Sequence, residues 1–162
     1  MSITTTPTRQ AADQFLKGHR IAVTGVSHAP KGHGSNAVYT FLRKQGYEVF
    51  AVNPNAPEVE GDRAYPSLGE IPGGVDAVVI GTRPERALDT MHECADLGIR
   101  QVWMHRAFGK GSVSADATAY GRDHDITVID GGCPLMFAEG GDGFHKGMCR
   151  VLTWTGKVPR KV

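Results

Sequence analysis

The sequence is short of cysteine, and this shortage excludes two kinds of scaffold. Its three cysteines are Cys94, Cys133 and Cys149, an odd number with wide spacing, which argues against a disulfide framework. No Cys-x-x-Cys pair is present, so nothing indicates a structural zinc site. Reduced thiols are the simplest interpretation, and we expect a cytoplasmic protein.

Charge of one sign and long apolar runs are also lacking. Eighteen Lys and Arg residues against 17 Asp and Glu residues leave a formal net charge of +1, which gives no reason to expect nucleic acid or a membrane as partner. The longest aliphatic run in the expected core, Ala77–Ile80, is far shorter than the ~20 apolar residues of a membrane helix. Residues 1–10 are polar and threonine-rich, so we expect no secretory signal.

Glycine, in contrast, is abundant, with 21 of 162 residues, and much of it separates short apolar runs. Runs this short, with little polar alternation, indicate strands buried on both faces. The expected strands are Ile21–Thr24, Glu48–Val52, Asp76–Gly81, Gln101–His105 and Ile126–Asp130.

Helix-length stretches lie between these runs, at Asn36–Gln45, Pro84–Leu97 and Ser114–His124. Gly46 and Gly98 follow the first two stretches, where a helix commonly ends. Strands that alternate with helices form βαβ units. The sequence therefore predicts an α/β fold: a Rossmann-like, doubly wound, mostly parallel sheet with helices on both faces.

The 162 residues suit a single domain, which we expect to span 1–162. An N-terminal helix is expected within residues 8–17 and an edge strand within Val59–Ile71. A further helix, Gly140–Thr155, is expected within a C-terminal extension over residues 135–162. A homodimer is considered only because symmetric dimers are common among soluble proteins in general.

The turn after the first strand has the composition of a phosphate-binding loop. Between Thr24 and the helix that starts near Asn36 lie Gly25, Ser27, Gly32, Gly34 and Ser35, together with His33. Glycine lets the backbone approach a phosphate, serine hydroxyls donate hydrogen bonds, and a helix N-terminus adds free N–H groups. A tight turn without a ligand remains the alternative.

The common nucleotide signatures are missing. Counted from Gly25, the second and third glycine positions of the dinucleotide motif hold Ser27 and Pro30. The second strand ends at Val52-Asn53-Pro54, without the acidic residue that binds the ribose of NAD. The sequence also contains no P-loop motif. These absences argue against NAD as the ligand.

Three motifs follow consecutive strands: Gly25-Val26-Ser27, Val52-Asn53-Pro54 and Thr82-Arg83-Pro84. Together with Tyr65-Pro66-Ser67-Leu68, Trp103-Met104 and Cys133-Pro134, they resemble the CoA-binding domain family. This family comprises small stand-alone proteins related to the CoA-binding domain of succinyl-CoA synthetase α subunits. The resemblance covers about Gly18–Pro134.

The resemblance implies a small-molecule ligand, coenzyme A or an acyl-CoA. It implies contacts to the diphosphate from Gly25, Val26, Ser27, Ser35 and Asn36, with His33 in the same loop. It implies an adenosine side at Val52, Asn53 and Pro54, phosphate or adenine contacts at Thr82 and Arg83, and pantetheine running toward Cys133. His33, Ala37 and Gly132 replace basic residues that members often carry, which implies weaker binding.

Two functions follow from these residues. The first is non-catalytic binding of coenzyme A or an acyl-CoA, as a carrier, sensor or regulator. The alternative is a nucleotide-dependent enzyme, either a CoA transferase or ligase component or an NAD(P)-dependent oxidoreductase. The spacing of the residues assembles no Ser-His-Asp triad, carboxylate pair or metal site. Cys133 either forms a mixed disulfide with the CoA thiol or, as we favour, is a buried residue at a turn.

Overall fold

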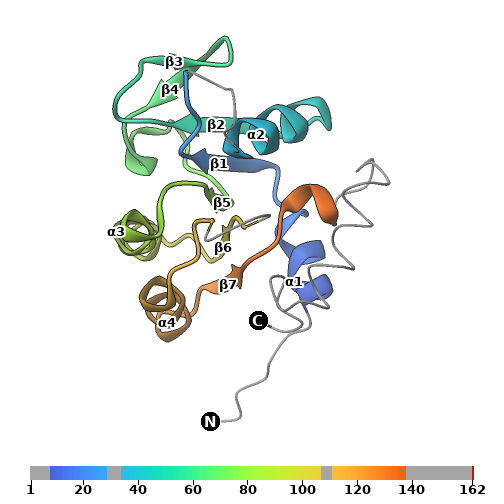
Figure 1. The fold of residues 1–162 in the computed structure, drawn as a ribbon, viewed down its shortest axis with the longest axis vertical. Helices are drawn as coiled ribbons and strands as arrows, with labels where there is room; N and C mark the ends of the chain where they lie inside the picture. Colours follow the sequence, from blue (N-terminus) through green and yellow to red (C-terminus); the bar gives the residue numbers. More distant parts are fainter. Residues whose placement is uncertain (1–7, 29–33, 107–110, 138–161) are drawn as a thin grey trace.

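The computed structural model describes residues 8–28, 34–106, 111–137 and 162. These residues form one seven-stranded sheet in the order β3-β4-β2-β1-β5-β6-β7 (Figure 1). Neighbouring strands are parallel, except that β3 and β4 are antiparallel. The strands are β1 (Arg20–Thr24), β2 (Glu48–Val52), β3 (Glu58–Val59), β4 (Asp62–Tyr65), β5 (Ala77–Ile80), β6 (Gln101–Met104) and β7 (Thr127–Asp130).

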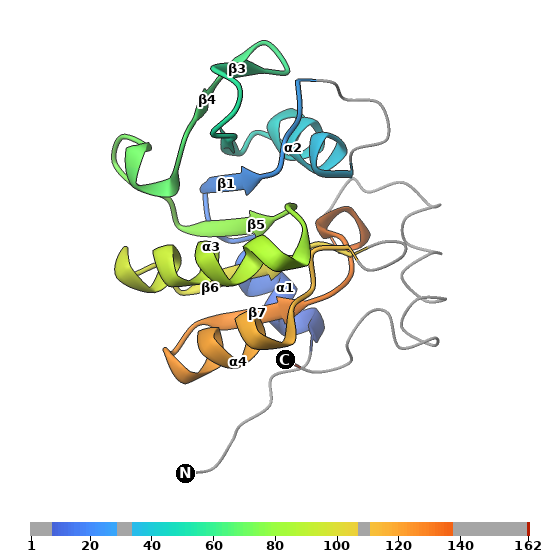
Figure 2. The same ribbon diagram turned by 60° about the vertical axis from the view of Figure 1, so that its left-hand side comes forward.

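Helices cover both faces of the sheet (Figures 1 and 2). One face carries α1 (Thr8–Phe15), α2 (Gly34–Lys44) and the short 3₁₀ helix η2 (Pro134–Met136). The other face carries α3 (Pro84–Asp96), α4 (Ala115–Asp123) and the 3₁₀ helix η1 (Leu68–Glu70). The predicted doubly wound α/β fold is therefore confirmed.

Alternating side chains of the central strands divide the core into two layers. Ile21 and Val23 pack on the α1–α2 face, whereas Ala22 between them packs on the α3–α4 face. Trp103 likewise packs on the α1–α2 face, while its neighbour Val102 packs on the other. A parallel strand buried on both faces needs apolar residues at every position, which is why these strands are continuous apolar runs.

The five strands predicted from apolar runs lie within one residue of those in the structure, and the four helices in the described region lie within two. The strand predicted within Val59–Ile71 is β4, which pairs with β2. It is not the edge strand, because β3 pairs with it on its other side. This two-residue strand, which was not predicted, turns into β4 through Glu60 (φ 51°) and Gly61 (φ 79°). Two consecutive positive φ angles make the tight turn that joins such a hairpin. The helix predicted at Gly140–Thr155 lies outside the described residues.

Candidate functional site

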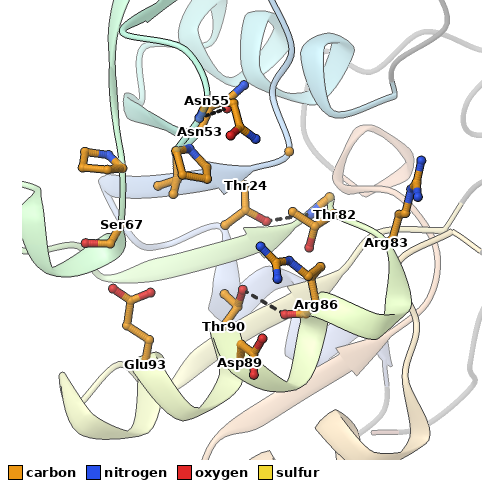
Figure 3. Close-up of a pocket in the computed structure, with 15 residues that line it drawn as sticks. Thr24, Asn53, Asn55, Ser67, Thr82, Arg83, Arg86, Asp89, Thr90 and Glu93 are labelled. Carbon is orange, nitrogen blue, oxygen red and sulfur yellow. Dashed lines mark hydrogen bonds between the residues drawn. The ribbon is translucent and has the colours of Figure 1, made fainter.

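A pocket of about 550 Å³ opens at the carboxyl ends of β1, β2, β4 and β5 (Figure 3). From the adjacent strands β1 and β5 the chain leaves in opposite directions along the sheet, to β2 and to β6. Ligands of open α/β sheets bind at such a switch point. The pocket is lined by Thr24, Gly25, Val52, Asn53, Pro54, Asn55, Pro66, Ser67, Gly81, Thr82, Arg83, Arg86, Asp89, Thr90 and Glu93.

Two glycines let the ends of β1 and β5 meet at this pocket. Gly25 has a φ of 76°, and a Cβ atom on it would lie 2.6 Å from the carbonyl oxygen of Gly81. A Cβ atom on Gly81 would lie 2.6 Å from the carbonyl oxygen of Thr24. The Ser35 hydroxyl donates to the Gly81 carbonyl at 3.1 Å, and the Gly81 N–H donates to Thr24 Oγ1 at 3.1 Å. Only residues without a side chain fit this contact.

Asn36, in the first turn of α2, fixes the turn that follows β1. Its Nδ2 group donates to the carbonyl oxygen of Ser27 at 2.8 Å and to Glu60 Oε1 at 2.7 Å. Its Oδ1 atom accepts from the Ser27 N–H at 2.9 Å. The Asn36 side chain is 4% exposed, and both of its amide hydrogens are used within the protein. Its contribution to the site is therefore to set the shape of the turn.

Asn53 connects the turn after β2 to the turn after β1. Its Nδ2 group donates to the Val26 carbonyl at 2.9 Å, and its Oδ1 accepts from the Asn55 N–H at 2.8 Å. Pro54 follows directly, and proline is unsuited to continuing a central strand. Asn53 stands where NAD-binding proteins carry an acidic residue. Its side chain thus connects two loops of the pocket.

Thr82, at the edge of the pocket, has a buried hydroxyl without a partner among the described residues. A buried hydroxyl without a partner costs about 1–3 kcal/mol, which a ligand can recover by bonding to it. Arg83 follows as the N-cap of α3 and is exposed, with Pro84 in the first turn of the helix.

The polar stripe that α3 presents to the pocket was not predicted from the sequence. Arg86, Asp89, Thr90 and Glu93 line it, at the three- and four-residue spacing of one helix face. Buried residues such as Met91 occupy the opposite side. The alternation of this polar stripe with the apolar one was the signal that would have found them.

The predicted site residues fall into four groups. Those that line the pocket are Gly25, Val52, Asn53, Pro54, Thr82 and Arg83. Those that lie in the adjoining turn or at the start of α2, outside the pocket lining, are Val26, Ser27, Ser35 and Asn36. His33 lies outside the described residues. The last predicted residue, Cys133, lies elsewhere in the fold.

Cys133 is a core residue on the α1–α2 face of the sheet. It is 4% exposed, belongs to the same apolar cluster as Trp103, and is not part of the pocket lining. Burial raises the pKa of its thiol to about 12. Because the thiolate is the reactive form of cysteine, this side chain is poorly suited to attack a ligand.

His105 lies just after β6, against the start of α2. A Cβ atom on Gly34 would lie 2.9 Å from its imidazole Cε1, so glycine is what allows the ring to sit there. Burial lowers the pKa of His105 to about 4. The imidazole is therefore neutral at physiological pH, and it adds no charge beside the first turn of α2.

No group of three or more His, Cys, Asp or Glu residues in the described part of the chain is arranged to hold a metal ion. None of the helices in this part of the chain is long and apolar enough to cross a membrane.

Comparisons with known proteins match the part of the chain that contains this pocket. The family model described as a CoA binding domain matches residues 19–139. The α subunit of the ADP-forming acetate–CoA ligase II of Pyrococcus furiosus is 37% identical over 90 residues, which are 56% of this chain and 20% of that subunit. This chain therefore spans only about a fifth of that relative. YneT of Bacillus subtilis is 31% identical over 124 residues, 76% of this chain and 88% of YneT.

A protein from Pyrococcus horikoshii OT3 has a similar solved structure. Its TM-score is 0.67 at 24% sequence identity, and the match covers 74% of this chain and 82% of that one. The likeness shows that the two chains share their fold.

Proposed function

This chain belongs to the CoA-binding domain family, and we propose that it binds coenzyme A or an acyl-CoA without catalysing a reaction, as a carrier, sensor or regulator. One observation carries the proposal. The turns after β1, β2 and β5 meet around one pocket at the switch point of the sheet, with Gly25 and Gly81 closely packed beside it. Closely packed glycines let the backbone approach a ligand that brings its own phosphate oxygens.

The ligand is proposed to lie with its diphosphate beside the turn after β1. The backbone of Gly25, Val26 and Ser27 forms that turn, and the first turn of α2, with Ser35 and Asn36, follows in sequence. A helix N-terminus favours anions through its free N–H groups and its dipole. Arg83, exposed at the start of α3, adds a positive charge on the opposite side of the pocket.

Adenosine is proposed to lie along the end of β2. Val52, Asn53 and Pro54 line the pocket there, and the Asn53 amide is committed to the backbone of Val26 and Asn55. An adenosine in this position would contact the apolar surface at the end of β2 and fit the shape of the pocket there. No carboxylate stands at this strand end to take both ribose hydroxyls, which is why NAD is not the proposed ligand.

Binding without catalysis is supported by the use of the polar side chains around the turn. The amides of Asn36 and Asn53 and the hydroxyl of Ser35 are bonded to protein backbone. The buried thiol of Cys133 has a pKa raised to about 12 and is directed to the core. These groups hold the site in shape, and none of them is set to transfer a proton or attack a thioester.

Thermal unfolding in the presence of CoA, acetyl-CoA, NAD, NADP and ATP tests the proposal. A ligand that binds only the folded state raises stability by RT ln(1 + [L]/Kd), so CoA is expected to raise the melting temperature and NAD to leave it unchanged. Stabilisation by NAD alone would contradict the proposal. Arg83→Met is expected to weaken CoA binding, while Lys44→Met, at the far end of α2, is expected to leave it unchanged.

A second candidate is favoured by the match to the acetate–CoA ligase α subunit. In that case the chain is the CoA-binding part of a larger ADP-forming ligase. Neither candidate is expected to make acetyl-CoA from acetate, ATP and CoA as the chain alone, and formation of the thioester by the purified chain would rule out the non-catalytic proposal. The two candidates differ when the remaining ligase subunits are added, because only a ligase component then supports formation of acetyl-CoA.

A further inference from the structure

The pocket carries opposite charges at its two ends. Arg83 and Arg86 lie at the start of α3, beside Thr82, whereas Glu93 lies further along the same helix, beside Ser67 (Figure 3). The carboxylate of Asp89 lies between them on the helix. Glu93 follows Arg83 by ten positions, which correspond to about 15 Å along an α-helix at about 1.5 Å per residue. An elongated ligand therefore meets cations at one end and a carboxylate at the other.

Glu93 is held in place by the backbone of η1. The N–H of Gly69 donates to Glu93 Oε1 at 3.0 Å, and the residue is half-buried. Within the described residues, no protein donor is bonded to the other carboxylate oxygen, Oε2. An ionised carboxylate only accepts hydrogen bonds. Glu93 is thus fixed through one oxygen and presents the other to a donor in the pocket.

We propose that Glu93 makes this site select adenine among the purine bases, by accepting a hydrogen bond from the 6-amino group. The inference rests on the proposed CoA function and adds to it the residue that distinguishes the base. The phosphates belong near the arginines and the first turn of α2, because cations and a helix N-terminus stabilise anions. The base then extends along α3 toward Glu93.

The substituent at position 6 of the purine ring determines which base Glu93 can bind. Adenine carries an amine there, which donates to the carboxylate. Guanine and hypoxanthine carry a carbonyl oxygen, which would face the carboxylate oxygen with no hydrogen between them. A site whose polar group is left without a partner rejects the wrong ligand more strongly than an apolar wall does.

Titration calorimetry with CoA and with its hypoxanthine analogue, in which O6 replaces the amine and N1 carries a proton, tests this inference. The wild-type chain is expected to bind CoA about 10- to 100-fold more tightly than the analogue, the range for a hydrogen bond to a charged group. Glu93→Gln is expected to lose this preference or reverse it, because a glutamine whose carbonyl oxygen accepts from the Gly69 N–H turns its NH2 group to the pocket, where it can donate to O6 but not accept from the amine. Glu85→Gln, an exposed residue of α3 outside the pocket lining, is the matched control and should keep the wild-type preference.

The outcomes separate this inference from the proposed function. If CoA binds and the wild-type chain shows no preference, or if Glu93→Gln keeps the full preference, Glu93 does not select the base, although CoA binding stands. If CoA does not bind the wild-type chain at all, both fail. Glutamine still accepts from the Gly69 N–H, and thermal unfolding without ligand checks that the variant remains folded.

Discussion

Asn36 is bonded to both backbone polar groups of Ser27, donating to its carbonyl oxygen at 2.8 Å and accepting from its N–H at 2.9 Å. The turn after β1 is thus fixed by the helix that follows it. Glu60 completes the arrangement from the β3–β4 hairpin, accepting the second amide hydrogen of Asn36 at 2.7 Å. A residue from the sheet edge therefore orients the amide that shapes the proposed diphosphate site.

Asn36→Ala is expected to lower the free energy of unfolding by about 1–3 kcal/mol, because it leaves the buried partners of the amide unsatisfied. It should also weaken CoA binding, since the turn is no longer held in one conformation. Urea unfolding and titration calorimetry measure the two effects. Lys44→Ala, at the exposed C-terminal end of α2, is the control. Unchanged affinity in Asn36→Ala would show that the turn does not depend on this amide.

His105 is expected to make the protein sensitive to mild acid. Burial lowers its pKa to about 4 in the folded state, against about 6.5 for an unperturbed histidine. Its contribution is therefore fully present above about pH 6.5 and is lost as the pH falls through about 4, amounting to as much as about 3 kcal/mol. Unfolding free energies between pH 7 and pH 4 should fall less steeply in His105→Gln than in the wild-type chain. Equal slopes would contradict the assignment, and the imidazole titration measured by NMR gives its folded-state pKa directly.

Asp62 is also expected to make the free energy of unfolding fall as the pH falls, but at lower pH than His105. The hydrogen bond from Tyr39 lowers the pKa of Asp62, as does its pairing with Arg43 at 2.6 Å. Its contribution is present above the ordinary carboxyl pKa and is lost as the pH falls through the lowered value. The difference in stability between the wild-type chain and Asp62→Asn should therefore be largest near neutral pH and shrink in strong acid. A difference that stays constant with pH would assign the effect to packing instead of charge.

Cys133 is expected to stay unmodified when the native protein is incubated with oxidised CoA. Its thiol is buried and its pKa is raised to about 12 by that burial, so little thiolate is available for exchange. Peptide mapping by mass spectrometry should find no CoA adduct on Cys133 in the native chain and alkylation after denaturation. Cys94, also buried with a raised pKa, is the internal comparison. An adduct on native Cys133 would contradict this prediction and show that the thiol can reach the bound ligand.

The sheet could be predicted from the sequence because strands buried on both faces are continuous apolar runs. Ala77–Ile80 is apolar throughout, and glycine or proline marks the positions where helices begin and end. The hairpin of β3 and β4 was harder, since a two-residue strand leaves no pattern and depends on the positive φ of Glu60.

The candidate site could be predicted in part. Motifs at the ends of β1, β2 and β5 predicted which loops meet, because the carboxyl ends of parallel strands lie at one edge of the sheet. They did not show which polar side chains are free. The amides of Asn36 and Asn53 are hydrogen-bonded to the backbone, whereas the hydroxyl of Thr82 has no partner. Cys133 packs in the core on the α1–α2 face of the sheet. Such pairing depends on tertiary contacts between residues distant in sequence.

Thr24 and Thr82 give a matched pair of substitutions with opposite expected effects on stability. The hydroxyl of Thr82 is buried without a partner, whereas that of Thr24 accepts from the Gly81 N–H at 3.1 Å. Thr82→Val is expected to raise the free energy of unfolding by about 1 kcal/mol, and Thr24→Val to lower it by about 1–3 kcal/mol, because only the second leaves a buried N–H unsatisfied.

Binding separates a structural from a ligand-binding role for Thr82. If its hydroxyl contacts CoA, Thr82→Val loses affinity about tenfold, the effect of one hydrogen bond, while its unfolding midpoint rises. If the substitution stabilises the free protein but weakens binding, the hydroxyl destabilises the free protein and the ligand offsets this loss of stability. Urea unfolding and calorimetry on the two variants measure both quantities. If Thr82→Val is more stable and binds CoA as tightly as the wild-type chain, the hydroxyl faces the pocket without contacting the ligand, and the proposed position of the phosphates must move toward Arg86.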